Sequence, residues 1–135
     1  MPTDTDAIAW DERYAIGEPD IDGQHRRLFA IYNEIAAVLA SGSSDAHRCH
    51  IILTELADYA RYHFLTEEAL MRARHFPRLA EHAREHREFC GVLQILADRV
   101  RQEGDVIHDV ARFVRQWILN HVILSDGLLR QYLRG

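Results

Sequence analysis

The chain has 135 residues and a formal net charge of −5, with acidic and basic side chains interspersed along it. A chain of this size is long enough to bury a real hydrophobic core, so we expect residues 1–135 to form a single domain. No basic face suggests a nucleic acid, and the acidic balance argues against binding to anionic membranes.

The N-terminal arm, residues 1–20, is predicted to be irregular because it contains prolines and a glycine. Its aromatic residues Trp10 and Tyr14 are predicted to pack across the helices rather than to bind a ligand. The arm does not resemble a signal peptide, because it lacks a basic segment followed by an apolar run. We therefore expect a cytoplasmic protein in which Cys49 and Cys90 remain reduced thiols.

Four helices are predicted after the arm, over residues 22–40, 46–74, 78–102 and 106–133. In the first helix, apolar residues recur every three or four positions and form one stripe: Leu28, Ile31, Ile35 and Leu39. Short connections make neighbouring helices antiparallel. The longest uninterrupted apolar run has six residues, too short for membrane insertion. The predicted fold is therefore all-α, an up-down-up-down four-helix bundle over residues 21–135.

Several residues predict where the helices begin and end. Ser44 or Asp45 is expected to cap the second helix, which should stop before Pro77 because the residue before a proline avoids helical geometry. Asp105 is expected to cap the fourth helix. An interruption of that helix is expected near Gly127.

Five histidines and two carboxylates, spread over the four predicted helices, are candidate metal ligands: His25, His63, Glu67, His82, His86, His121 and Asp126. Nitrogen and oxygen donors without a thiolate suit iron, manganese or zinc. Seven donors are too many for one tetrahedral zinc ion, whereas two metal ions bridged by the two carboxylates would use all seven. Without metal, buried imidazoles and carboxylates would be costly.

Helical spacing predicts how these donors point. Residues four apart lie on one helix face, so His63 and Glu67 should point the same way, as should the pair at 82 and 86. His121 and Asp126 are five apart, which leaves two possibilities. Either the Asp126 side chain reaches sideways, or the helix contains a widened π turn, a feature that concentrates at functional sites.

The remaining histidines, His47, His50, His75 and His108, fall outside this pattern and are predicted to lie on the surface or in loops. Glu68 adjoins a candidate ligand but must face elsewhere on its helix. It is predicted to face solvent or to contact a ligand from outside the site.

The order and spacing of the seven donors resemble the hemerythrin family, specifically its single-domain bacterial members (bacteriohemerythrins). The resemblance includes Trp10 and Tyr14, the IDGQH segment, the run from His63 to Met71, and the break at residues 76–77. It implies two iron ions joined by an oxo or hydroxo bridge, with Glu67 and Asp126 also bridging them. One iron would be held by His82, His86 and His121. The other would keep an open position and be held by His25 and His63.

By this resemblance, the function is reversible O2 binding at a non-heme di-iron centre, for oxygen transport, storage or delivery, rather than catalysis. Residues about one turn from the ligands are predicted to line the O2 pocket, although simple core packing would also explain them: Leu28, Phe64, Trp117 and Ile118. A ferritin-like di-iron enzyme is disfavoured, because no glutamate stands three residues before a histidine. Two alternatives stay open: O2 or redox sensing through an unidentified protein partner, and a di-iron enzyme acting on peroxide, nitric oxide or O2.

Overall fold

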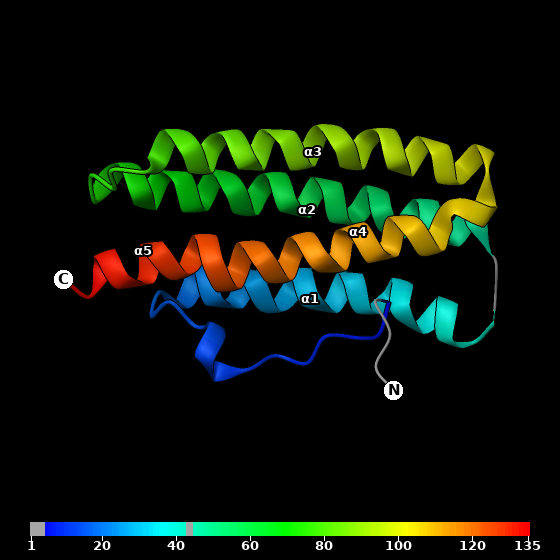
Figure 1. The fold of residues 1–135 in the computed structure, drawn as a ribbon, viewed down its shortest axis with the longest axis horizontal. Helices are drawn as coiled ribbons and strands as arrows, with labels where there is room; N and C mark the ends of the chain where they lie inside the picture. The colour runs from blue at the N-terminus through cyan, green and yellow to red at the C-terminus, as the bar shows by residue number, and fades with distance from the viewer. Residues whose placement is uncertain (1–4, 43–44) are drawn as a thin grey trace.

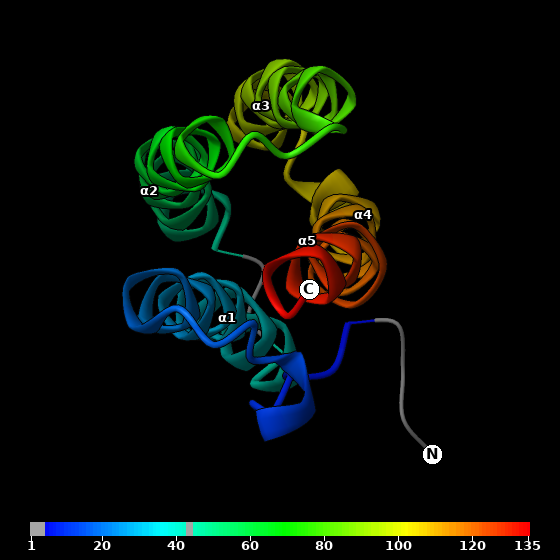
Figure 2. The same cartoon turned by 90° about the vertical axis from the view of Figure 1, so that its left-hand side faces the viewer.

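The computed structural model describes residues 5–42 and 45–135, which form four helical columns that run alternately up and down (Figure 1). Three columns are α1 Pro19–Ala40, α2 Ala46–Ala73 and α3 Leu79–Gln102. The fourth consists of α4 Ile107–Asn120, a π-helical turn η3 His121–Ser125, and α5 Asp126–Leu133. Two 3-10 turns, η1 Glu12–Tyr14 and η2 Gly104–Val106, complete the described elements. Seen end-on, the columns occupy the four corners of a bundle, which confirms the predicted fold class (Figure 2).

The N-terminal arm is fastened along the outside of α1 (Figure 1). The Asn33 side chain accepts a hydrogen bond from the Ile8 amide at 2.7 Å and donates one to the Ile8 carbonyl at 2.9 Å. Trp10 and Tyr14 make edge and tilted ring contacts with each other and with Phe29. The predicted packing role of Trp10 and Tyr14 is therefore confirmed.

The first helix begins earlier than predicted, at Pro19 rather than at residue 22. Proline is well suited to the first helical position, because its missing N–H would be unpaired there in any case. The Asp22 carboxylate is buried and accepts hydrogen bonds from the amides of Ile16 at 2.8 Å and Gly17 at 3.2 Å. This contact joins the end of the arm to the first turn of α1.

The sequence correctly predicted the residue that caps α2 but not the one at the start of α4. The Asp45 carboxylate accepts a hydrogen bond from the amide three residues later, as predicted for the cap of α2. Ser44 lies outside the described residues. The prediction that Asp105 caps the fourth helix is wrong, since Asp105 lies within η2 and Val106 takes the cap position without a side-chain cap. The 3-10 turn delays the start of α4 and pairs the Val106 amide with a backbone carbonyl instead.

The α2 helix is terminated by a residue with left-handed backbone geometry that lies shortly before Pro77. His75 has a φ of +56°, and the Phe76 amide donates a hydrogen bond to the Met71 carbonyl at 2.9 Å. These two features define a Schellman motif, in which an apolar contact normally accompanies the turn. Phe76 and Met71 belong to the same apolar cluster, as the motif requires. The helix ends at Ala73, close to the predicted position.

Both cysteines lie on helices as unpaired thiols, as the sequence predicted. Cys49 in α2 and Cys90 in α3 are both free. Burial raises the pKa of each thiol, which keeps both protonated and unreactive near neutral pH. Among the helices that the structure describes, none combines the length and the apolarity needed to cross a membrane.

Two apolar clusters lie along the bundle, and a polar layer separates them. The larger cluster includes Leu28, Phe64, Phe89 and Ile118. The smaller consists of Ile16, Ile21, Met71, Phe76 and Leu129, with partly buried neighbours. Along each column, the candidate ligands lie between residues of the larger cluster on one side and residues of the smaller cluster, or its partly buried neighbours, on the other. The fold therefore places the polar side chains inside the bundle, enclosed at both ends by packed hydrocarbon.

Candidate metal centre

All seven predicted ligands meet in this polar layer. Each column contributes at least one of them, and every one is 4% exposed or less: His25, His63, Glu67, His82, His86, His121 and Asp126. Burial of so many ionisable groups is unusual, because such groups are almost always on the surface unless they are paired or bind a metal. The layer is thus the candidate functional site.

The donors divide into two groups that share Glu67. Within each group, one possible ligand atom from every residue lies within 4.8 Å of the others. The first group is Glu67, His82, His86 and His121, and the second is His25, His63, Glu67 and Asp126. Each group therefore offers four converging donor atoms, and the two groups are suited to hold two cations side by side.

The two oxygens of Glu67 face different groups. Oε2 lies 3.4 Å from Nε2 of His25 and 3.1 Å from Nε2 of His63. Oε1 lies 3.0, 3.2 and 3.4 Å from the Nε2 atoms of His82, His86 and His121. One carboxylate thus stands between the two sets of imidazoles, with one oxygen for each.

Asp126 repeats this arrangement from the opposite column. Its Oδ2 lies 2.8 Å from Nε2 of His25, and its Oδ1 lies 2.8 Å from Nε2 of His82 and 3.3 Å from Nε2 of His121. A carboxylate whose two oxygens serve two donor groups has the geometry of a bridging ligand. The layer contains two such carboxylates.

A widened turn brings Asp126 into the site. The Asp126 amide donates its hydrogen bond to the His121 carbonyl, five residues earlier, so the segment His121–Ser125 is π-helical. The turn places residues 121 and 126 on one face, where an α-helix would separate them. Of the two possibilities that the sequence left open, the π turn is confirmed. The interruption predicted near Gly127 is this turn, which ends two residues before it.

The inner atoms of the site are crowded but poorly hydrogen-bonded. Within the part of the chain that the structure describes, several buried side-chain atoms have no hydrogen-bond partner: both ring nitrogens of His25, Nε2 of His63, both oxygens of Glu67, Nδ1 of His121 and Oδ2 of Asp126. Buried polar atoms are normally satisfied, and such exceptions call for an explanation such as a bound ion. Among these atoms, the Nε2 atoms of His25 and His63 converge with the carboxylate oxygens of Glu67 and Asp126, which fits metal ligation.

The electrostatics of the layer favour positive charge. Burial alone lowers the pKa of His25, His82 and His121, but the close approach and negative charge of the Asp126 and Glu67 carboxylates outweigh it. The net effect raises the pKa of His25 and His121 to about 9 and that of His82 to about 10. The same contacts overcome burial in the carboxyls and hold the pKa of Glu67 and Asp126 below the usual range. The layer thus holds anions that require cations, whether protons or metal ions.

A family model described as the hemerythrin HHE cation binding domain matches residues 17–133 of this chain. The chain belongs to the hemerythrin family. A bacteriohemerythrin of Methylococcus capsulatus is 32% identical over 108 residues, covering 79% of this chain and 81% of that protein. One of Stenotrophomonas maltophilia is 32% identical over 121 residues, covering 88% and 76%. A myohemerythrin of Theromyzon tessulatum is 24% identical over 117 residues, covering 87% and 86%.

Two of the candidate ligand histidines have partners on the side of the ring that faces away from the site. Nδ1 of His63 lies 2.7 Å from Oε1 of Gln24, and Nδ1 of His86 lies 2.7 Å from Oε2 of Glu68. Each contact leaves Nε2 free to face the site and fixes the ring orientation. Of the two positions predicted for Glu68, the structure shows the second, a contact with a candidate ligand from outside the site. Sequence reasoning missed Gln24, because its partner lies on another helix and no spacing rule connects them.

The aromatic residues predicted to line an O2 pocket lie against the three-histidine group of the hemerythrin site. The Phe64 ring stacks on His86 with centroids 3.9 Å apart, and the Trp117 ring stacks on His121 at 4.5 Å. Phe64 also approaches His63 with centroids 5.7 Å apart. The other two predicted lining residues, Leu28 and Ile118, are buried in the larger apolar cluster. A role of these four residues in O2 binding remains a prediction.

Three of the four remaining histidines lie where the sequence predicted. His47, His75 and His108 are exposed. His50 differs, because it is half-buried between α2 and α3, where its Nδ1 lies 2.8 Å from the Ala97 carbonyl oxygen and donates to it. The prediction of a surface histidine at position 50 is therefore wrong. A hydrogen bond to a helix carbonyl made partial burial of the ring possible.

Proposed function

We propose that this hemerythrin binds O2 reversibly at a centre of two iron ions. The observation that supports this most is the placement of Glu67, whose two oxygens face separate groups of histidines. His82, His86 and His121 would hold one iron, and His25 and His63 the other. Glu67 and Asp126 would bind both. An iron held by only two histidines would have fewer protein ligands than the other, so O2 would bind on the side of His25 and His63.

The donor set favours a carrier over an oxygen-activating enzyme. Iron, when bound, supplies the electrons that reversible O2 binding requires. Five neutral imidazoles and two carboxylates give the centre little negative charge, which disfavours oxidation of the metals beyond the ferric state. The two apolar clusters exclude water from both ends of the polar layer. Gln24 and Glu68 restrain the imidazoles of His63 and His86.

The test of this proposal is metal content together with reversibility. Protein purified from iron-supplied cells is expected to contain two iron ions per chain by elemental analysis. An anaerobic ferrous sample should develop a visible absorption band when exposed to O2, and the band should disappear on degassing and return on re-exposure. A single zinc ion per chain without an iron-dependent band would contradict the proposal, as would a band that never reverses.

We further expect Ile118 to limit the access of water to the site. Ile118 is 2% exposed and lies one turn before His121. The O2-bound protein should decay fastest in Ile118→Ala, more slowly in Ile118→Val and slowest in the wild type, at equal iron content. Shortening the side chain opens space beside the ligands for water, which promotes autoxidation. The stability cost of such a cavity is typically ~2–5 kcal/mol for Ile→Ala and ~0.5–1.5 kcal/mol for Ile→Val.

The matched control for this series is Ile35→Ala, because Ile35 is fully buried in the same apolar cluster but lies about ten residues along α1 from His25. The control should lose stability in the same way without faster decay of the O2-bound form. Equal decay rates for Ile118→Ala and the wild type would show that Ile118 is ordinary core.

A further inference from the structure

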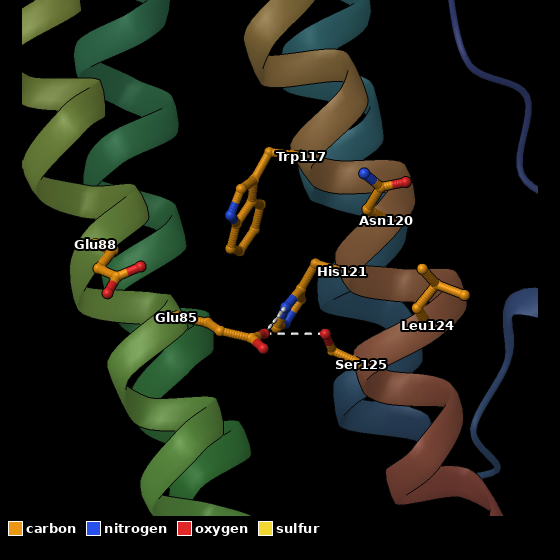
Figure 3. Close-up of a pocket in the computed structure, with 7 residues that line it drawn as sticks. All are labelled: Glu85, Glu88, Trp117, Asn120, His121, Leu124 and Ser125. Carbon is orange, nitrogen blue, oxygen red and sulfur yellow. Dashed lines mark hydrogen bonds and ion pairs between the residues drawn. The ribbon is translucent and has the colours of Figure 1, made fainter.

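A surface pocket of about 230 Å³ reaches the metal centre from outside, between α3 and the π turn η3 (Figure 3). We propose that this pocket is a capture site for divalent metal ions, which bind there before they pass to the buried donors. The inference rests on the proposed metal centre but concerns a separate, outer site. Four features of the pocket support it: its acidic wall, its floor, its contrast with a second pocket and its position beside the π turn.

The wall on α3 presents two carboxylates. Glu85 and Glu88 are about one helical turn apart and both line the pocket (Figure 3). The Glu85 side chain is 47% exposed, so ions in solution can reach it. Its Oε2 accepts a hydrogen bond from the Ser125 hydroxyl in η3 at 2.9 Å, which holds the carboxylate over the opening. Carboxylate oxygens suit hydrated divalent cations.

The floor of the pocket is His121, a donor of the buried centre. Nε2 of its ring faces inward, 3.4 Å from Oε1 of Glu67. Nδ1 faces outward, 3.7 Å from Oε2 of Glu85, which is too long for a hydrogen bond. Although His121 is only 4% exposed, its Nδ1 has no hydrogen-bond partner among the described residues. A cation in the pocket would displace the proton from this buried, unpaired nitrogen, as metal binding to histidine does, and would gain it as a third ligand atom.

A second pocket that reaches a ligand histidine has the opposite character. It leads to His86 from the α2–α3 side and is flanked by Arg61 and Arg87. These guanidinium groups repel cations, and Nδ1 of His86 is already occupied by Glu68 at 2.7 Å. Of the two openings, only the one with Glu85 and Glu88 attracts positive ions and ends at an unpaired donor atom.

The local structure also suits transfer inward. The pocket lies beside the π turn, whose hydrogen-bond pattern interrupts the α-helix at His121. A cation held by Glu85 and Nδ1 of His121 has to cross only the width of one imidazole ring to reach Nε2 and Glu67. Trp117 also lines the pocket and stacks on His121, so its fluorescence can report an ion bound there.

The experiment follows the uptake of Co²⁺ by metal-free protein, using the visible absorption of protein-bound cobalt. In Glu85→Gln/Glu88→Gln, we expect the initial uptake rate at low salt to fall on the order of tenfold, as removal of a steering field does. Final cobalt content should stay at the wild-type level. The matched control is Glu34→Gln/Glu55→Gln, which removes the same charge from a pocket on α1 and α2 that also contains Asp45 and His47. The control should load at close to the wild-type rate.

A second measurement uses Trp10→Phe, which leaves Trp117 as the sole tryptophan. Quenching of Trp117 should precede the cobalt absorption, and this early phase should vanish in the Glu85→Gln/Glu88→Gln background. Equal uptake rates for the two double variants, or quenching and absorption that develop together, would overturn the capture site. A wild-type protein that takes up no metal would instead refute the proposed centre itself, so the two failures are distinguishable.

Discussion

Replacing Asp126 with alanine should cost the protein at least one of the two metal ions proposed per chain and most of the iron-dependent visible absorption expected of it. Asp126 contacts His25 on one side and His82 on the other at 2.8 Å, so it serves both donor groups. Its loss would remove a carboxylate from both proposed metal positions, together with a negative charge that would offset the two cations. Metal affinity should therefore fall by more than the roughly 10–100-fold typical of losing an outer contact to a ligand.

Two further variants calibrate this effect. Glu68→Gln weakens only the contact behind His86, so its metal affinity should fall within that range of about 10–100-fold. His108→Ala changes an exposed histidine and should bind metal like the wild type. Elemental analysis after dialysis and titration against a competing chelator give the order of affinities. Comparable losses in Asp126→Ala and His108→Ala would show that the proposed ligand assignment is wrong.

Removing the metal should lower the melting temperature substantially. The polar layer buries two anions and several unpaired donor atoms, and metal binding to the folded chain compensates for them. A ligand present at about 1,000 times its Kd stabilises the native state by about 4 kcal/mol. For a chain of this size, that corresponds to a rise in Tm on the order of 10 °C. Equal melting temperatures for the metal-free and metal-bound forms would contradict this prediction.

The stability difference between the two forms should depend on pH. In the metal-free protein, the folded-state pKa values of His25, His82 and His121 are raised to about 9, 10 and 9. Their stabilising contribution is complete below the unfolded value of about 6.5 and is lost as pH rises through 9 to 10. Burial lowers the pKa of His63, so this histidine changes the stability with pH in the opposite direction. Its single contribution is opposed by those of the three histidines above.

The two buried carboxyls determine how low the pH can fall before the metal-free protein loses stability. The pKa of Glu67 and of Asp126 is lowered in the folded state, so their contribution is present above about pH 4.5 and is lost as pH falls. Metal-free protein should thus be most stable between about pH 4.5 and 6.5 and should weaken toward pH 9. Metal-bound histidines carry no added proton, so the metal-bound form should change less over that range. Calorimetry of both forms at several pH values tests whether the difference in Tm widens as pH rises.

The helices and the donor set could be recognised from local patterns. Apolar residues at three- and four-residue steps predict the helices, and the stripe containing Ile31 and Ile35 is buried as expected. The paired spacing of His63 with Glu67 reflects the geometry of a single helix, which depends only on the chain itself. The end of α2 near Pro77 was predictable because the effect of a proline on the residue before it is also local to the chain. A Schellman motif on a histidine was not, because left-handed residues of that kind are normally glycine.

The contacts between columns were decided by packing. Whether Asp126 reached sideways or a π turn carried it inward depended on how the fourth column sits against α1 and α3. The contacts of Gln24 with His63 and of Glu68 with His86 each join two helices whose relative rotation no spacing rule specifies. The same holds for the pocket of Glu85 and His121. Periodicity along one helix determined which side chains face inward, whereas the distances between helices determined which atoms meet.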